Sequence, residues 1–121
     1  MIAAPVAHVI DDDATFRESL AWMFQTVSIA CKTYGTAQEF EEDGCLTSPG
    51  CLILDLQLRS ETGVEVLRKL RAAGNDVKFG FVTSESTPEM KEQAEAAGAL
   101  FFIVKPFSAE RFDEVFAPIL G

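Results

Sequence analysis

Chemically reactive side chains stand directly after short apolar segments of this chain. They are acids, a hydroxyl and a lysine: Asp11, Asp12, Asp13, Asp55, Thr83 and Lys105. Carboxylates suit hard cations such as Mg²⁺, which prefer oxygen ligands. A carboxylate can also act as a nucleophile, and a lysine presents a point charge to an anionic oxygen. The residue types are therefore compatible with cation binding and phosphoryl chemistry, provided that the fold brings them together.

The apolar segments that precede these residues predict buried strands, because they are short and bounded by turn residues. They are residues 6–10, 51–54, 77–83 and 100–104. A less regular segment, residues 29–34, predicts a further strand near an edge of the sheet. In open α/β sheets, ligands bind beyond the carboxyl ends of the strands. We therefore expect the reactive side chains to meet at that edge.

Helix-capping residues between these segments predict a helix after each strand. The predicted caps are Asp13, Thr36 in a capping box, Ser86 or Thr87, and Ser108. Gly74 and Gly98 are placed to end the third and fourth helices. Five strands that alternate with five helices predict a parallel sheet covered on both faces. We expect residues 1–121 to form a single domain.

Helical spacing in the first predicted helix separates a buried face from an exposed one. The buried face is predicted to contain Phe16, Leu20, Met23, Phe24 and Val27. Arg17 and Glu18 are predicted to face solvent. His8, inside the first strand, is predicted to be structural, because its neighbours are apolar.

Composition excludes several classes of protein. A formal net charge of −9 argues against a nucleic-acid-binding surface, which needs clustered lysine and arginine. The first residues lack the basic and apolar regions of a signal peptide, and no apolar run reaches transmembrane length. Cys31, Cys45 and Cys51 have no paired metal-binding spacing, so we expect free, mostly buried thiols in a reducing compartment.

The chain resembles the receiver domains of two-component response regulators along essentially its whole length. The likeness rests on four motifs in order: Ile10-Asp11-Asp12, Asp55 with Gly63 eight positions later, Val82-Thr83, and Val104-Lys105-Pro106-Phe107. Each motif alone is weak, but the four together at this spacing are specific. The resemblance implies a flavodoxin-like α/β fold with strand order 2-1-3-4-5.

The resemblance also implies roles for individual residues. Asp55 would accept a phosphoryl group from a histidine kinase or phosphotransfer protein. Mg²⁺ (or Mn²⁺) would be held by Asp11, Asp12, Asp55 and the backbone carbonyl of Gln57. Thr83 and Lys105 would bind phosphoryl oxygens, Thr83 and Phe102 would act as the switch, and the Lys105–Pro106 bond would be cis. Such a domain is a phosphoacceptor and not a turnover enzyme.

The resemblance further implies partners and a location. The face formed by the fourth helix, fifth strand and fifth helix would bind a downstream protein, an output domain or, after phosphorylation, a second copy of the chain. The domain itself would contact neither nucleic acid nor membrane, and it would be cytoplasmic. Two residues depart from the family pattern: Arg59 stands where proline is usual, and Ser84 where a smaller residue such as alanine is common.

Clustered carboxylates carry an energetic penalty. At about 4 Å and an effective dielectric constant near 20, each like-charged pair costs about 4 kcal/mol. Without a cation, the pKa of at least one carboxyl should rise, and Mg²⁺ would remove the penalty. The same ion would neutralise charge that develops during in-line phosphoryl transfer.

Two other functions compete with this hypothesis. Asp11-Asp12-Asp13-Ala14-Thr15 also fits the D-x-D-x-[TV] opening of haloacid-dehalogenase-like phosphatases, with Asp11 as nucleophile and Asp13 as acid/base. That assignment leaves Asp55 without a role and lacks the late acidic motif and cap domain of that family. The third hypothesis is a receiver-like interaction module that is never phosphorylated.

Overall fold

The computed structural model describes residues 5–43 and 50–120 of the chain. Its centre is a parallel five-stranded sheet with the order β2-β1-β3-β4-β5. The strands are β1 (Val6–Ile10), β2 (Ala30–Tyr34), β3 (Gly50–Asp55), β4 (Lys78–Thr83) and β5 (Phe102–Val104). The sequence-based fold class and strand order are confirmed, and β2 lies at an edge as expected.

A helix follows each strand, and most of the helices begin at a side chain that accepts a backbone N–H. They are α1 (Ala14–Thr26), α2 (Ala37–Glu42), α3 (Gly63–Ala72), α4 (Pro88–Ala96) and α5 (Ala109–Leu120). The predicted caps Asp13 and Thr36 accept such bonds, Thr87 rather than Ser86 caps α4, and Ser108 accepts from the N–H of Arg111. Thr62, which was not predicted, caps α3. Local capping chemistry therefore sets the helix starts.

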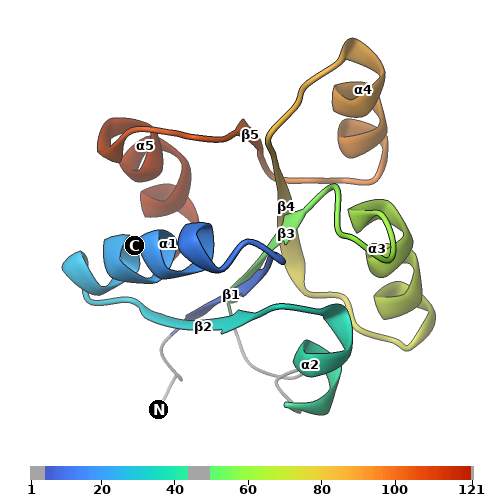
Figure 1. Ribbon diagram of the computed structural model, residues 1–121, viewed down its shortest axis with the longest axis horizontal. Coiled ribbons are helices and arrows are strands. Elements are labelled where there is room, and N and C mark those ends of the chain that lie inside the picture. Colours follow the sequence, from blue (N-terminus) through green and yellow to red (C-terminus); the bar gives the residue numbers. More distant parts are fainter. Residues whose placement is uncertain (1–4, 44–49, 121) are drawn as a thin grey trace.

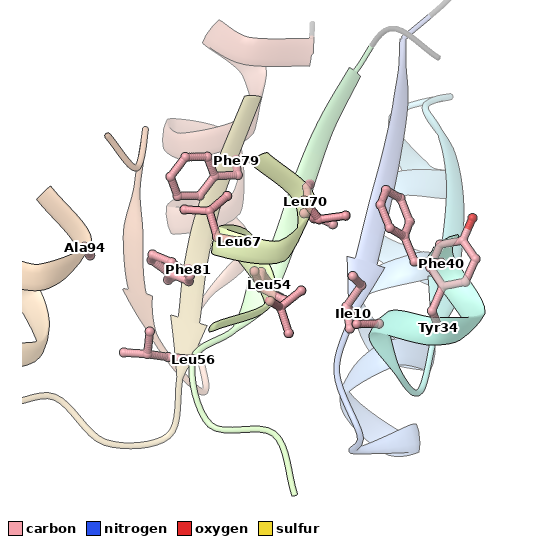
Figure 2. Close-up of a cluster of buried hydrophobic side chains, with 13 residues drawn as sticks. Ile10, Tyr34, Phe40, Leu54, Leu56, Leu67, Leu70, Phe79, Phe81 and Ala94 are labelled. Atoms are coloured by element: carbon pink, nitrogen blue, oxygen red, sulfur yellow. The ribbon is translucent and has the colours of Figure 1, made fainter. Parts of the chain in front are cut away.

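The helices cover both faces of the sheet. α1 and α5 lie on one side, and α2, α3 and α4 lie on the other (Figure 1). Alternate residues along each strand contribute to two separate cores. The core under α2, α3 and α4 includes Ile10, Leu54, Phe81, Leu67 and Leu70 (Figure 2), and the core under α1 and α5 includes Val9, Ile53, Phe24, Phe112 and Phe116. Both cores hold the strand ends rigidly.

Several local predictions were wrong. Val27 is 44% exposed because it is the residue that ends α1 rather than part of its buried face. Arg17 is half-buried, because its guanidinium turns back to the end of β1. The last strand begins at Phe102 rather than Leu100, although the N–H of Leu100 still donates to Phe79 O at 2.9 Å.

His8 and the cysteines are structural in character. His8 is 1% exposed, and its ring lies 5.5 Å from that of Phe40 between ring centroids. Cys51 is buried and Cys31 is half-buried, and neither forms a disulfide. Burial raises the pKa of Cys51 to about 12 and that of Cys31 to about 11, so both thiols stay protonated near pH 7. Cys45 lies outside the described residues.

None of the helices in the described ranges is long and apolar enough to span a bilayer.

Candidate functional site

Three carboxylates converge at the carboxyl edge of the sheet. Asp11, Asp12 and Asp55 each place a side-chain oxygen so that the three lie within 4.8 Å of one another. The sheet register explains this, because Ile10 of β1 pairs with Leu54 of β3 and the acids follow directly. Asp11 is fully buried and Asp55 is 5% exposed. Two adjacent parallel strands therefore deliver their acids to one point.

Lys105 joins this cluster from the end of β5, which is an edge strand of the sheet. Its Nζ lies 2.5 Å from Asp11 Oδ2 and 3.5 Å from Asp55 Oδ2. Its side chain is 13% exposed, and Nζ also sits 4.3 Å from the centre of the Phe16 ring. Its backbone N–H donates to Thr83 O at 2.8 Å, and the bond to Pro106 is cis. The long lysine stem spans from β5 to the ends of β1 and β3, and it offsets part of their negative charge.

Asp55 is the carboxyl whose pKa changes most clearly. Burial, first of all, and then the charge of Asp11 raise the pKa of Asp55 to about 6, against the N–H of Gln57 and the charge of Lys105, which lower it. The pKa of Asp55 therefore rises as expected, although burial contributes more than repulsion by Asp11. At pH 7 most Asp55 carboxyls remain ionised. A poised carboxylate at a sheet edge is typical of functional sites.

Of the other predicted site residues, Gln57 contacts Asp55, Thr83 ends the neighbouring strand, and Phe102 lies in the adjacent core. Gln57 N donates to Asp55 Oδ1 at 3.0 Å, which holds the carboxylate in place. Thr83 is buried at the end of β4, next to the strand of Asp55, and its Oγ1 accepts from Glu85 N at 3.2 Å. Phe102 is half-buried and packs against the core under α2, α3 and α4. The metal, phosphoryl-binding and switch roles of these residues remain predictions.

Asp13 differs from its two acidic neighbours. Its Oδ1 accepts the N–H groups of Thr15 and Phe16 at 3.0 and 3.3 Å, and so caps α1. Its own N–H donates to Asp11 Oδ1 at 2.9 Å. Asp13 therefore shapes the loop, and its carboxylate is already engaged.

A cavity of about 670 Å³ opens beside Asp55 and gives reagents access to the carboxylates. Its lining includes Asp12, Asp55, Lys105 and Ser84, one of the two positions that depart from the family pattern. The donor set suits a divalent ion: carboxylate oxygens lie close together, one is destabilised by burial, and backbone and water could complete the ligands. The residues present therefore fit Mg²⁺.

Comparison with known proteins assigns the chain to a family. Residues 7–117 match the response regulator receiver domain. The chain belongs to that family. It is 28% identical over 104 residues to the transcriptional regulatory protein TdiR of Thauera aromatica, covering 86% of this chain and 46% of TdiR. It is 32% identical over 100 residues to the transcriptional regulatory protein FixJ of Azorhizobium caulinodans, covering 83% of this chain and 47% of that protein.

Solved structures agree with this assignment. A response regulator receiver protein from Burkholderia phymatum superposes with a TM-score of 0.83 at 35% identity, over 97% of this chain and 95% of the other. The chain spans about half the length of the curated relatives that it matches. The comparisons thus favour a receiver domain of two-component signalling over the phosphatase hypothesis.

Two arginines contact the receiver site: Arg17, which was predicted to face solvent, and Arg59, which was predicted only to place a positive charge near the site. Arg17 Nη1 donates to the backbone oxygen of Asp11 at 2.6 Å. Arg59 donates its backbone N–H to Asp12 Oδ2 at 2.9 Å, across 47 positions of the sequence. For Arg17 the signal was its place one turn into α1, directly above the acidic loop. For Arg59 the sequence predicted a cation near the site but not its contact with Asp12, because no local pattern reports a contact of such long range.

Proposed function

We propose that this receiver domain accepts a phosphoryl group on Asp55 from a histidine kinase or phosphotransfer protein. Asp11, Asp12, Asp55 and the backbone carbonyl of Gln57 would hold Mg²⁺ or Mn²⁺. The observation that carries the proposal is the convergence of three carboxylates with Lys105 at one edge of the sheet. That arrangement places a nucleophile, a cation site and a fixed positive charge within reach of one phosphoryl group.

The chemistry follows from the environment of each residue. Bound Mg²⁺ would supply neutralisation of the charge that develops on the phosphoryl oxygens. An ionised oxygen of Asp55 attacks phosphorus, the bond from phosphorus to the donor histidine nitrogen breaks, and a phosphorus–oxygen bond to Asp55 forms. Nζ of Lys105 then exchanges part of its interaction with Asp55 for a phosphoryl oxygen, and the Thr83 hydroxyl donates to another. In this proposal the domain is a phosphoacceptor and not a turnover enzyme.

Signal output would depend on Thr83 and Phe102, which link Asp55 to the face formed by α4, β5 and α5. Phosphate on Asp55 would draw Thr83 inward and let Phe102 turn, which biases two pre-existing conformations. The face formed by α4, β5 and α5 would then bind a downstream protein, an output domain or a second copy of the chain. TdiR and FixJ are named as transcriptional regulators and are about twice as long as this chain, which supports an output domain as one such partner. We propose that this signalling takes place in the cytoplasm, without direct nucleic-acid contact by the domain.

Mass spectrometry after treatment with a small phosphodonor tests the proposal. Incubation with acetyl phosphate and MgCl₂ should add one phosphoryl group, which reductive trapping should locate on Asp55. Asp55→Asn should abolish incorporation, whereas Asp113→Asn, at an exposed aspartate of α5, should not. A domain that remains unmodified would support the unphosphorylated module instead. Steady phosphomonoester hydrolysis that is lost in Asp11→Asn but kept in Asp55→Asn would support the phosphatase.

A further inference from the structure

Arg59 touches the proposed metal ligand Asp12 through both its backbone and its side chain. The backbone N–H donates to Asp12 Oδ2 at 2.9 Å. The side-chain Nε lies 3.7 Å from the same oxygen. A proline at this position would have neither an N–H nor a charge, so the backbone contact requires a residue other than proline and the ion pair requires a cation.

The two cations of the site hold the carboxylates very differently. Lys105 is 13% exposed and lies against Asp11 and Asp55, on the side where the phosphoryl group would bind. The Arg59 side chain is 89% exposed and lies against Asp12, whose side chain is 27% exposed. An exposed pair at this separation is weak and breaks readily. Arg59 is therefore a loosely held, permanent positive charge at the solvent side of the cluster.

A divalent ion at Asp12 would have to share that carboxylate with the guanidinium. The two like charges would repel one another across a short distance, because Arg59 Nε lies 3.7 Å from the Asp12 oxygen that would bind the ion. Because the Arg59 side chain is 89% exposed, it can move away from Asp12, so the repulsion weakens ion binding and does not block it. Salt would screen the repulsion, because the groups are exposed to solvent.

We infer that Arg59 is an internal competitor for the cation at Asp12, and that it weakens Mg²⁺ binding by this receiver domain in a salt-dependent way. The inference rests on the proposed function, since it assumes that Mg²⁺ binds at Asp12. It assigns to Arg59 a regulatory role: the metal occupancy of the site, and hence its readiness for phosphorylation, would respond to Mg²⁺ concentration over a higher range.

Isothermal titration with MgCl₂ tests this directly, without reference to phosphorylation. Arg59→Gln removes the charge and keeps the backbone N–H. It should bind Mg²⁺ about three- to tenfold more tightly than the unaltered chain at low salt, a range set by the strength of exposed ion pairs and doubled for a divalent ion. Arg59→Lys keeps the charge and should bind as the unaltered chain does. Arg68→Gln, at an exposed arginine of α3, makes the same change in net charge away from Asp12 and should change affinity little.

The salt dependence sharpens the test. In about 1 M NaCl the Debye length is about 3 Å, so the ratio of the Mg²⁺ affinity of Arg59→Gln to that of the unaltered chain should fall towards one. Equal affinities of Arg59→Gln and Arg68→Gln at low salt would overturn the inference, as would tight binding by Arg59→Lys. An unaltered chain that binds no Mg²⁺ would instead overturn the metal site of the proposed function. Circular dichroism of each variant verifies that the fold is unchanged.

Discussion

His8 and Asp55 are two buried titratable groups on adjacent strands of one sheet, but only Asp55 has polar partners for its side chain. His8 lies within β1 at 1% exposure, and neither ring nitrogen has a hydrogen-bond partner among residues 5–43 and 50–120. Asp55 lies at the end of β3 at 5% exposure, and it has the N–H of Gln57 and the ammonium of Lys105 beside it. Burial disfavours charge at both positions, but only the sheet edge supplies groups that sustain it.

The two groups bias stability in opposite directions with pH. Burial, followed by the charge of Lys32, lowers the pKa of His8 below its usual 6.5. As pH falls through 6.5, the unfolded chain gains a proton that the folded chain resists, so stability is lost on acidification. Asp55 has its pKa raised from 3.8 to about 6, so between these values the unfolded chain releases its proton first, and stability is lost as pH rises. Removing one of the two groups should reveal the pH dependence of stability that the other contributes.

The largest effect on stability is expected at Phe40, whose ring packs against His8. Its ring is fully buried and packs edge-on against His8 and Tyr34 at 5.5 and 5.4 Å between centroids. Phe40→Ala should lower the free energy of unfolding by about 3–5 kcal/mol, because it leaves a cavity in the core. Urea denaturation measures this, with Trp22→Ala, at a 66% exposed site, as the control. A loss below about 1 kcal/mol would mean that the pocket around His8 collapses without cost.

Asp55→Asn should stabilise the domain in the absence of metal. Because the net environment disfavours the ionised carboxylate, the gain at pH 7 should be about 3 kcal/mol and should vanish near pH 4. Urea denaturation in EDTA at several pH values measures it, with Asp113→Asn as the matched control. Added Mg²⁺ should narrow the gap by stabilising the unaltered chain through binding. A destabilised Asp55→Asn variant would show that Lys105 outweighs burial at this position.

Gly63→Ala tests the close approach of the start of α3 to the end of β3, where the backbone leaves no room for a side chain. A Cβ on Gly63 would lie 2.7 Å from the backbone oxygen of Asp55 and 3.0 Å from Leu56 Cα. The end of β3 would have to move, so we expect a loss of about 1–3 kcal/mol and slower phosphorylation by acetyl phosphate. Gly35→Ala, whose Cβ would meet only side-chain atoms at 3.5 Å or more, is the control. Equal behaviour of the two variants would contradict this account of the edge.

The smallest effect is expected at His8 itself. His8→Leu removes two unpartnered buried nitrogens and keeps an apolar side chain in the space, so it should stabilise the domain by about 1 kcal/mol at pH 7. The gain should grow as the pH falls below 6.5, because the charged form of His8 is the one disfavoured. Thermal denaturation at pH 7 and near pH 5 measures both. A less stable variant at either pH would reveal a hydrogen-bond partner for His8.

Much of the fold could be predicted because it depends on neighbours in the sequence. The cap at Asp13, the end of α3 near Gly74 and the apolar core of β3 each follow from residues within a few positions. The errors at Val27 and Leu100 concern where an element ends or begins, whereas the error at Arg17 arose from a contact outside its helix. Arg17 was expected in solvent from helical spacing alone, but the backbone oxygen of Asp11 draws it inward. The strand order came from the resemblance to receiver domains, because periodicity does not specify which parallel strands are neighbours.

By itself, then, the sequence determined the alternation of strands and helices, the positions of the acids after β1 and β3, and the family. Only the tertiary structure decided how the cations are distributed: Lys105 lies on Asp11 and Asp55, and Arg59 lies on Asp12. The reason is physical. Strands and caps arise from local backbone hydrogen bonding and periodic burial, whereas an ion pair depends on the separation of two loops, which the packing of the whole sheet sets.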